Sequence, residues 1–212
     1  MKIENQNHQK YIILQSDYKP RQYTVEADFS QGAFFLVAGA IGNDVKATGL
    51  NKNSLQGDKQ ILDILKQCGA NMQIDEEGIT ASSDSLKSIT IDAKNIPDLV
   101  PILAVLCTFC KGESKIINAG RLRLKESDRL AAITTELNKL GAKIEEGQDY
   151  LKIQGVESLK GGAVDSWNDH RIAMALAIAS TRCNEPVIIN GKDSVKKSYP
   201  DFWDDFNKMR GE

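Results

Sequence analysis

Apolar and polar residues follow one plan in three successive stretches of this chain. Each stretch opens with an apolar run of helical length that is rich in small residues, at 31–41, 98–110 and 170–180. A shorter apolar run comes after each of them, at 44–50, 114–120 and 186–191. The long runs predict buried helices and the short runs predict strands.

A second, amphipathic helix is predicted in each stretch, at 59–70, 128–142 and 200–211. In the middle one, apolar residues recur at spacings of three and four, from Leu130 to Leu140. A glycine stands at each exit, where a left-handed cap costs little only for glycine: Gly69, Gly141 and Gly211. These glycines are about 70 residues apart, and self-similarity at a fixed period indicates stacked supersecondary units.

The first two glycine caps are followed by a predicted pair of strands, as in 142–155. Each unit is therefore predicted to run strand, helix, strand, helix, strand, strand, with amphipathic helices covering sheets. The fold class we predict is α/β (α+β), as a three-fold repeat of βαβαββ units. The third unit is predicted to be incomplete, because only Glu212 follows its glycine cap.

Residues 1–16 resemble the stretch that follows Gly141, with a "KIE" start, a polar turn and an alternating strand. We therefore expect the chain to begin inside the tail of an earlier repeat and to be half of a larger protein. The alternative is that residues 1–16 form a hairpin that folds back to fill the strand positions vacant in the third repeat.

Charge and composition argue against several classes of protein. Lys and Arg number 27 against 29 Asp and Glu, for a formal net charge of −2, which argues against a nucleic-acid or anionic-membrane surface over the whole chain. No run reaches the ~18 apolar residues of a membrane span. The polar N-terminus "MKIENQNHQK" lacks the apolar core of a signal peptide. We therefore expect a cytoplasmic protein.

Two of the four cysteines, Cys107 and Cys110, have the C-x-x-C spacing. A zinc site would need a second pair or histidines nearby in sequence, and neither is there. A redox motif stays open, but the apolar flanks favour small residues of a buried helix. No metal site is predicted.

The most concentrated charge lies at 121–132, "RLRLKESDRLAA", around the start of the middle amphipathic helix. Ser127 or Asp128 is a natural N-cap for that helix. Lys125 and Arg129 are four residues apart and share a face if the helix extends back that far. Free amides and adjacent cations at a helix N-terminus make a good anion site. For this stretch alone, a solvated capping segment is the slightly favoured interpretation.

A second loop, "SWNDHR", brings a cation to the start of the last apolar helix. Asn168 or Asp169 can cap this helix, and Arg171 then falls in its first turn, where the helix dipole disfavours a cation. An anionic ligand at the same helix end would offset that cost. His170, between the cap and the arginine, is equally well interpreted as a packed residue and as a functional one.

Two more features fit the same picture. Lys196 and Lys197 precede a Pro-Asp helix start, and Asp98 stands just before an apolar run. Asp98 is either an N-cap or a general base held near the cations. Together these loops predict a pocket for a phosphorylated or carboxylated small molecule, in which Asp98 and Glu126 handle protons. The cations that would bind its charge are Lys125, Arg129, Arg171 and Lys197.

Long stretches of the sequence resemble the motifs of a known family. "LKESDRLAA" and "NDHRIAMALAIA" are similar to the two signatures of the 5-enolpyruvylshikimate-3-phosphate (EPSP) synthases, or 3-phosphoshikimate 1-carboxyvinyltransferases. "NSLQGD", "NIPDLVPILA" and "KKSYPDFW" match the family in the expected order, and 25–41 resembles its domain-crossover segment. The resemblance runs essentially from end to end.

The family's fold has two similar domains, each built from three βαβαββ units. The resemblance therefore implies that this chain is an enolpyruvyl transferase-like domain, the C-terminal half of the enzyme. It implies that residues 1–24 are the tail of the preceding N-terminal domain with the crossover, and that residues 25–212 are the C-terminal domain. In the family, the whole chain's own N-terminal strands complete the last unit of this domain, which accounts for the truncated third repeat.

The resemblance also implies roles for individual residues. Asp98 matches the base that takes the proton from the 5-hydroxyl of shikimate 3-phosphate, and Glu126 matches a proton donor near the enolpyruvyl methylene. Lys125 matches a lysine that touches the shikimate hydroxyl and the reacting centre. The cations that match the phosphoenolpyruvate ligands are Arg129, Arg171 and Lys197. No metal or organic cofactor is implied. Arg121 stands where the family often has an amide or acid that contacts shikimate 3-phosphate.

The expected partners are the substrates phosphoenolpyruvate and shikimate 3-phosphate and the N-terminal half of the same enzyme, with no nucleic acid and no membrane. The family's lysine–serine motif, its serine-serine-glutamine phosphate cradle and an essential arginine belong to that other half, so we expect this chain alone to be inactive. One alternative is the related UDP-N-acetylglucosamine enolpyruvyl transferase, in which we do not expect "KESDR" with "NDHR". The other is a non-catalytic anion-binding or interaction domain left by truncation.

Overall fold

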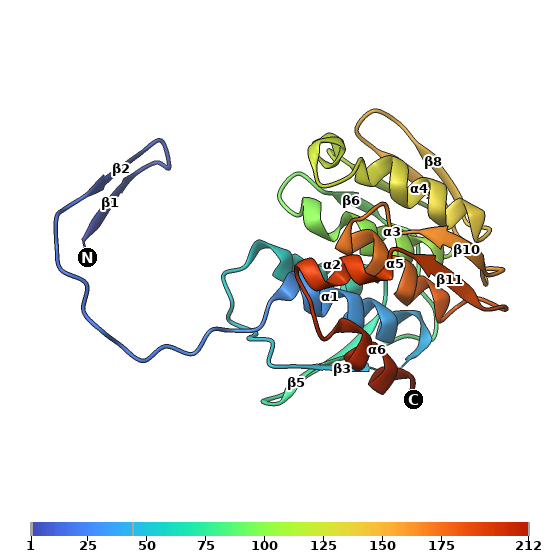
Figure 1. Ribbon diagram of the computed structural model, residues 1–212, viewed down its shortest axis with the longest axis horizontal. Coiled ribbons are helices and arrows are strands. Elements are labelled where there is room, and N and C mark those ends of the chain that lie inside the picture. The colour runs from blue at the N-terminus through green and yellow to red at the C-terminus, as the bar shows by residue number, and fades with distance from the viewer. Residues whose placement is uncertain (1, 44, 212) are drawn as a thin grey trace.

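The computed structural model describes residues 2–43 and 45–211. Met1, Asp44 and Glu212, which fall within segments predicted above, lie outside the described residues. The helices are α1 (Phe29–Ala38), α2 (Ile61–Gln67), α3 (Val100–Thr108), α4 (Arg129–Lys139), α5 (His170–Ser180) and α6 (Phe202–Arg210) (Figure 1). The strands are β1 (Ile3–Gln6), β2 (Lys10–Ile13), β3 (Val45–Thr48), β4 (Asn71–Ile74), β5 (Gly78–Ser82), β6 (Thr90–Asp92), β7 (Glu113–Ile117), β8 (Lys143–Glu146), β9 (Leu151–Gln154), β10 (Gly162–Asp165) and β11 (Val187–Asn190).

The apolar helices α1, α3 and α5 pack against one another at the centre of the molecule. Every residue of α3 is buried, and α5 is buried from His170 to Ala179. A helix that is apolar on all sides is stable in water only inside a core, so the prediction of buried helices here is confirmed. None of the helices in the described part of the chain has the length and apolar content to cross a membrane.

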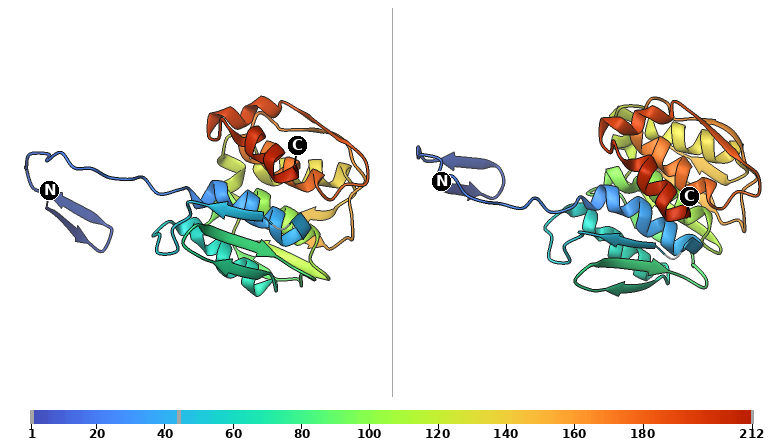
Figure 2. Two further views of the ribbon diagram at one scale, coloured as in Figure 1. Left: turned by 90° about the horizontal axis from the view of Figure 1, so that it is seen from below. Right: turned by 60° about the horizontal axis from the view of Figure 1, so that its bottom comes forward.

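Short sheets cover this helical core. The strand order is β3-β5-β4 in one sheet, β6-β7-β9-β8 in another and β10-β11 in a third. β6 pairs with β7, and β10 with β11, in parallel register. Parallel strands need a crossover connection, which α3 and α5 supply. In Figure 2, α1 lies along the sheet that contains β3 and β5. The fold is therefore mixed α/β, as predicted.

The N-terminal hairpin does not lie where one interpretation of the sequence placed it. β1 and β2 pair with each other in antiparallel register, with Ile3 opposite Ile13. Asn7 and His8 in the turn have positive φ, which suits a tight hairpin. Figures 1 and 2 show the hairpin apart from the rest of the protein, at the end of an extended connection. The expectation that this hairpin fills the vacant strand positions of the third repeat is wrong, because β1 and β2 form a sheet of their own and, among the described residues, neither strand pairs with β10 or β11.

The cysteines are free thiols. Cys68, Cys107 and Cys110 are buried, and Cys183 is half-buried. A hydrogen bond with Cys107, together with burial, raises the pKa of the Cys110 thiol. A thiol with a raised pKa is a poor nucleophile and a poor metal ligand at neutral pH. The interpretation of the C-x-x-C cysteines as small core residues is therefore confirmed.

Candidate active site

The starts of α3, α4 and α5 meet at one end of the helical core, together with the end of the short helix η5 (Lys192–Lys197). Asp98 lies in the short helix η3 (Pro97–Leu99), which leads into α3. Ion pairs join it to Arg129 of α4 and to Arg171 of α5. Residues far apart in sequence are thus in direct contact. The segments that meet here carry every residue predicted for the pocket: Asp98, Lys125, Glu126, Arg129, Arg171 and Lys197.

Two aspartates start the helices that carry the arginines. Asp128 accepts a hydrogen bond from the Ala131 amide at 3.1 Å and caps α4. Asp169 accepts one from the Arg171 amide at 2.9 Å and caps α5. Ser127, the other candidate cap of α4, instead donates from Oγ to Asp169 at 3.0 Å. That bond ties the two helix starts together.

Asp98 lies among three cations. Its Oδ1 is 3.2 Å from Lys125 Nζ and 2.9 Å from Arg129 Nη1, and its Oδ2 is 3.6 Å from Arg171 Nη2. The start of α3 has no side-chain cap, so the carboxylate contacts the cations and not the helix amides. Burial opposes ionisation, but Arg171, Lys125 and Arg129 outweigh it and lower the pKa of Asp98. Asp98 is therefore ionised, the state from which a carboxylate accepts a proton.

Arg129 is buried between carboxylates. Its Nε lies 2.7 Å from Asp169 Oδ2 and its Nη2 lies 3.3 Å from Asp169 Oδ1. Such bidentate pairs fix the orientation of both groups. Asp169 is 0% exposed, and although burial opposes its ionisation, the bonds from Arg129 lower its pKa. Only a capping role was predicted for Asp169, because its second partner, Arg129, lies 40 positions earlier in the chain.

Glu126 contacts a histidine as well as an arginine. Its Oε2 lies 2.9 Å from His170 Nδ1 and 3.7 Å from Arg129 Nη2. The contact with His170 is close but is not aligned as a hydrogen bond. Burial lowers the pKa of His170 although Glu126 opposes this shift, so the ring is neutral at neutral pH. His170 is thus a packed residue that touches one of the two predicted acid–base groups.

The same residues offer a possible metal-ligand set. Ligand atoms of Glu126, Asp169 and His170 lie within 4.8 Å of one another. However, both oxygens of Asp169 already accept hydrogen bonds from Arg129, and a neighbouring guanidinium repels a metal cation. These surroundings favour an ion-pair network over a metal centre, and the absence of a metal stays a prediction.

Arg171 has an unused hydrogen-bonding group. The residue is 7% exposed, and its buried Nη1 has no hydrogen-bond partner. A buried polar group left unsatisfied costs about 1–3 kcal/mol. An anion bound at the start of α5 would remove that cost and would offset the unfavourable dipole in the first turn of the helix.

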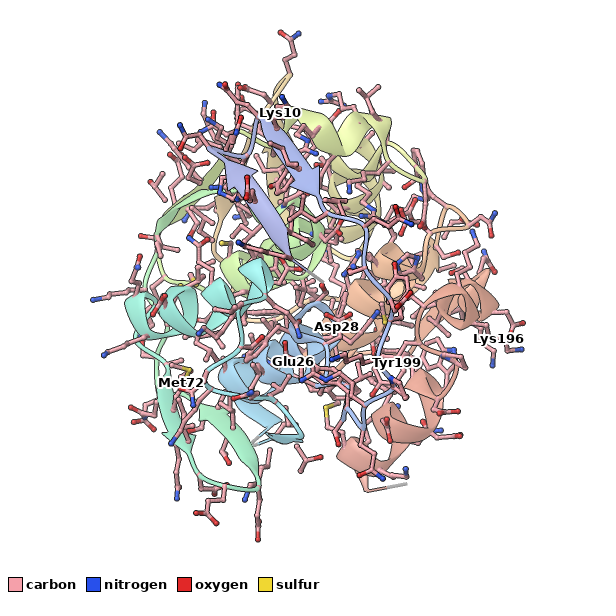
Figure 3. The ribbon with its side chains drawn as sticks, turned by 90° about the vertical axis from the view of Figure 1, so that its left-hand side faces the viewer. Lys10, Glu26, Asp28, Met72, Lys196 and Tyr199 are labelled. Atoms are coloured by element: carbon pink, nitrogen blue, oxygen red, sulfur yellow. The ribbon has the colours of Figure 1, made fainter. Side chains whose placement is uncertain are left out.

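Lys197 reaches the same helix start through the backbone. Its Nζ donates a hydrogen bond to the carbonyl oxygen of Asn168, directly before Asp169. Lys196 behaves differently, because it pairs with Asp193 at 2.8 Å and points outward in Figure 3. Of the two adjacent lysines, the structure therefore brings only Lys197 to the cluster.

The arginines before α4 have separate surroundings. Arg123 lies in η4 (Gly120–Leu124) and donates to Asp128 at 2.7 Å and to the Gln148 oxygen at 2.9 Å. Arg123 therefore fastens this loop to the turn between β8 and β9. Arg121 is exposed, and a contact with substrate stays untested for it.

The segment at 53–58, "NSLQGD", holds the start of α1. Gln56 Oε1 accepts a hydrogen bond from the Phe29 amide at 2.8 Å, and its Nε2 donates to the Ala27 oxygen at 2.9 Å. Figure 3 shows Glu26 and Asp28 where the chain enters this helix. Sequence reasoning missed this structural role, because Gln56 lies 27 residues from its partner Phe29.

Comparisons with known sequences and structures all point to one family. The family model of the EPSP synthases (3-phosphoshikimate 1-carboxyvinyltransferases) matches residues 1–206. The 3-phosphoshikimate 1-carboxyvinyltransferase of Clostridium novyi (strain NT) is 56% identical over 212 residues, which are 100% of this chain and 49% of that protein. The enzyme of the same name from Clostridium acetobutylicum is 52% identical, again over 100% of this chain and 49% of the relative. An EPSP synthase structure from Acinetobacter baumannii has a TM-score of 0.82 and 26% identity, covering 98% of this chain and 51% of that one.

This chain spans about half the length of the curated relatives it matches. The match extends over nearly all of its own residues, in sequence and in fold, and includes the loops that form the cluster of charges. The chain belongs to the EPSP synthase family.

Proposed function

We propose that this chain is the C-terminal half of an enzyme that moves the enolpyruvyl group of phosphoenolpyruvate to the 5-hydroxyl of shikimate 3-phosphate and releases phosphate. The supporting observation is the Asp98 carboxylate among three cations, one of which, Arg171, has a buried nitrogen without a partner. The reaction serves the shikimate pathway of aromatic amino-acid biosynthesis, in the cytoplasm.

The reaction needs a base, an acid and bound charge at one place. Asp98 takes the proton of the 5-hydroxyl while that oxygen adds to C2 of phosphoenolpyruvate, and Glu126 gives a proton to the methylene carbon. The result is a tetrahedral adduct. Loss of a proton from the new methyl group and of phosphate from C2 then restores the double bond. Lys125, beside Asp98, stabilises charge at the reacting centre.

Phosphoenolpyruvate is a multiply charged anion that several cations must hold. Arg129, Arg171 and Lys197 bind its carboxylate and phosphate. Their place at the starts of α4 and α5 supports this assignment, because free backbone amides and the helix dipole also favour an anion there.

The proposed domain is a repeat of three βαβαββ units, the last incomplete. The order β6-α3-β7-α4-β8-β9 supports the unit, and β10-α5-β11-α6 follows it as far as the second helix. Residues 1–24 are then the tail of the N-terminal domain with the crossover, and residues 25–212 are the C-terminal domain. The N-terminal half supplies further phosphate ligands, so this chain by itself is inactive.

Complementation tests the proposal. The chain is titrated with each substrate by calorimetry, and phosphate release is then measured after addition of the separately expressed N-terminal half of the Clostridium novyi relative. We expect weak or absent binding alone and turnover only with both parts, abolished by Asp98→Asn and kept in Asp193→Asn. Absence of turnover after complementation contradicts the enzymatic proposal and favours a non-catalytic anion-binding domain.

A further inference from the structure

A buried glutamate on α4 contacts the turn that precedes α5. Glu136 lies about two helical turns after Arg129, and its side chain is 1% exposed. Its Oε1 accepts a hydrogen bond from Trp167 Nε1 at 2.8 Å, and its Oε2 accepts one from the Asp165 amide at 3.0 Å. Lys139 donates to both oxygens at 2.8 Å. Since a buried charge persists only when it is paired and hydrogen-bonded, the glutamate and the turn depend on each other.

The turn has a conformation that its sequence does not favour. Trp167 and Asn168 have φ of 52° and 53°, and consecutive left-handed residues other than glycine persist only where the surroundings enforce them. The Trp167 amide donates to Asp165 Oδ1 at 2.6 Å, and the Asn168 amide donates to Ser166 Oγ at 3.3 Å. These short-range bonds shape the turn, and the bonds to Glu136 attach it to another element.

The turn carries two groups of the charged cluster. Its last carbonyl, that of Asn168, accepts the hydrogen bond from Lys197 Nζ, and the next residue is Asp169, which binds Arg129. A change in the backbone at Asn168 therefore moves the acceptor that holds the Lys197 ammonium group. Within the described part of the chain, Glu136 forms hydrogen bonds with Lys139 and with the turn, and none with Lys197 or Arg129. It would therefore act on Lys197 only through the turn.

We propose that Glu136 is a positioning residue of the anion site, which holds the left-handed turn at Trp167 and Asn168 and thereby places the ammonium group of Lys197. This inference deepens the proposed function and rests on it only for the identity of the anion. The placement of Lys197 is a property of this chain whether or not phosphoenolpyruvate is the ligand.

The chain offers matched variants. Glu136→Ala removes both bonds to the turn, whereas Lys139→Met removes only the exposed partner of the glutamate and should leave the turn in place. Glu136→Gln has one acceptor and one donor, so it can accept from only one of the two turn N–H groups. Adding Trp167→Phe to this variant removes the indole N–H donor. The side-chain oxygen of the introduced glutamine can then accept from the backbone N–H of Asp165. The double variant should therefore be less perturbed than the sum of its single variants.

Lysine labelling in this chain gives the first measurement. An amine-acylating reagent is applied in limiting amount, and the modification of Lys197 is divided by that of Lys196, whose side chain is 66% exposed. Loss of one hydrogen bond should raise the ratio about fivefold in Glu136→Ala, because the Lys197 amine loses its acceptor. The ratio should stay unchanged in Lys139→Met. In Glu136→Gln/Trp167→Phe it should lie within about twofold of Trp167→Phe alone.

An unchanged ratio in folded Glu136→Ala overturns the inference. If that variant does not fold, the double-mutant cycle of Glu136→Gln and Trp167→Phe decides. The inference is overturned if the effects of the two substitutions on the labelling ratio are strictly additive. In the complemented enzyme, Glu136→Ala should raise KM for phosphoenolpyruvate about fivefold and leave KM for shikimate 3-phosphate unchanged. If Lys197→Ala does not change KM for phosphoenolpyruvate, the proposed function fails while the labelling result still stands. If Lys197→Ala raises this KM and Glu136→Ala does not, the positioning role fails.

Discussion

Replacing Asp169 by asparagine measures how much stability depends on one buried carboxylate. Asp169 accepts hydrogen bonds from Arg129 Nε and Nη2, from Ser127 Oγ and from the Arg171 amide, at 2.7 to 3.3 Å. Asp169→Asn keeps the size of the side chain but removes its charge and one acceptor oxygen. The buried guanidinium of Arg129 then loses its bidentate partner.

The expected loss in the free energy of unfolding follows from the charge of Arg129, which stays buried in Asp169→Asn. Breaking a buried ion pair by removing one partner costs about 3–5 kcal/mol. Arg129 keeps Asp98 as a second partner at 2.9 Å, so we expect the lower end, about 3 kcal/mol. With a urea m-value of roughly 2 kcal/mol/M, the unfolding midpoint should fall by about 1.5 M.

Equilibrium urea unfolding, followed by circular dichroism, checks this value. The matched control is Asp193→Asn, because Asp193 and its partner Lys196 have side chains that are 72% and 66% exposed. An exposed pair contributes little, so the control should change the free energy of unfolding by less than about 0.5 kcal/mol. A midpoint for Asp169→Asn within about 0.3 M of wild type would refute the reasoning, since Arg129 would then not need this carboxylate.

Other predictions test the backbone at Gly191, the pKa of His170 and the half-buried Arg182. Gly191→Ala should cost about 2 kcal/mol in urea unfolding, because φ is +70° and a Cβ would lie 2.4 Å from Ser166 Oγ; Ser166→Ala should recover part of the loss. NMR should show a pKa of His170 below the ordinary histidine range, because burial disfavours the imidazolium. This group then removes stability as pH falls through the unfolded histidine pKa, and a raised value contradicts the argument. Arg182→Ala should lower the free energy of unfolding by about 1–3 kcal/mol, since the guanidinium donates to two backbone oxygens, and an unchanged melting temperature would contradict this.

The sequence predicted the elements of the fold better than their partners. Helices and strands depend on local periodicity and on local caps such as Gly141, which has φ of 98°, so each could be found from a short window. Strand pairing depends on contacts between distant segments. The parallel pairs β6-β7 and β10-β11 were therefore not visible in the sequence, and the partner of the N-terminal strands was mistaken in one interpretation. A strand pattern says which face is apolar and not which edge it meets.

The same distinction applies to the candidate site. Cations before helix starts are local features, so Lys125, Arg129 and Arg171 could be proposed from spacing and capping alone. The bond between Arg129 and Asp169 spans 40 positions, and that between Glu136 and Trp167 spans 31. Neither hydrogen bond produces a periodic pattern in the sequence, because each residue is common in the helix or turn where it lies.

The charges of the cluster explain why half a site should bind an anion weakly. The cations are Lys125, Arg129, Arg171 and Lys197, and the carboxylates among them are Asp98, Glu126 and Asp169. The carboxylates neutralise most of this positive charge, so a phosphorylated ligand must compete with Asp98 for the same guanidinium and ammonium groups. Under the proposed function, the N-terminal half supplies the remaining cations.

Asp98→Asn should therefore strengthen anion binding by this chain alone and abolish turnover by the complemented enzyme. Asp98→Asn frees Lys125, Arg129 and Arg171 from a competing carboxylate, so this chain alone should bind phosphoenolpyruvate about tenfold more tightly, a gain of roughly 1.4 kcal/mol. The same change removes the base, so the complemented enzyme should lose turnover. Calorimetry at low ionic strength, with Asp193→Asn as control, measures the first effect, and phosphate release measures the second. Weaker binding by the Asp98→Asn chain would contradict the argument, because it would show that Asp98 holds the cations in place for the anion instead of competing with it.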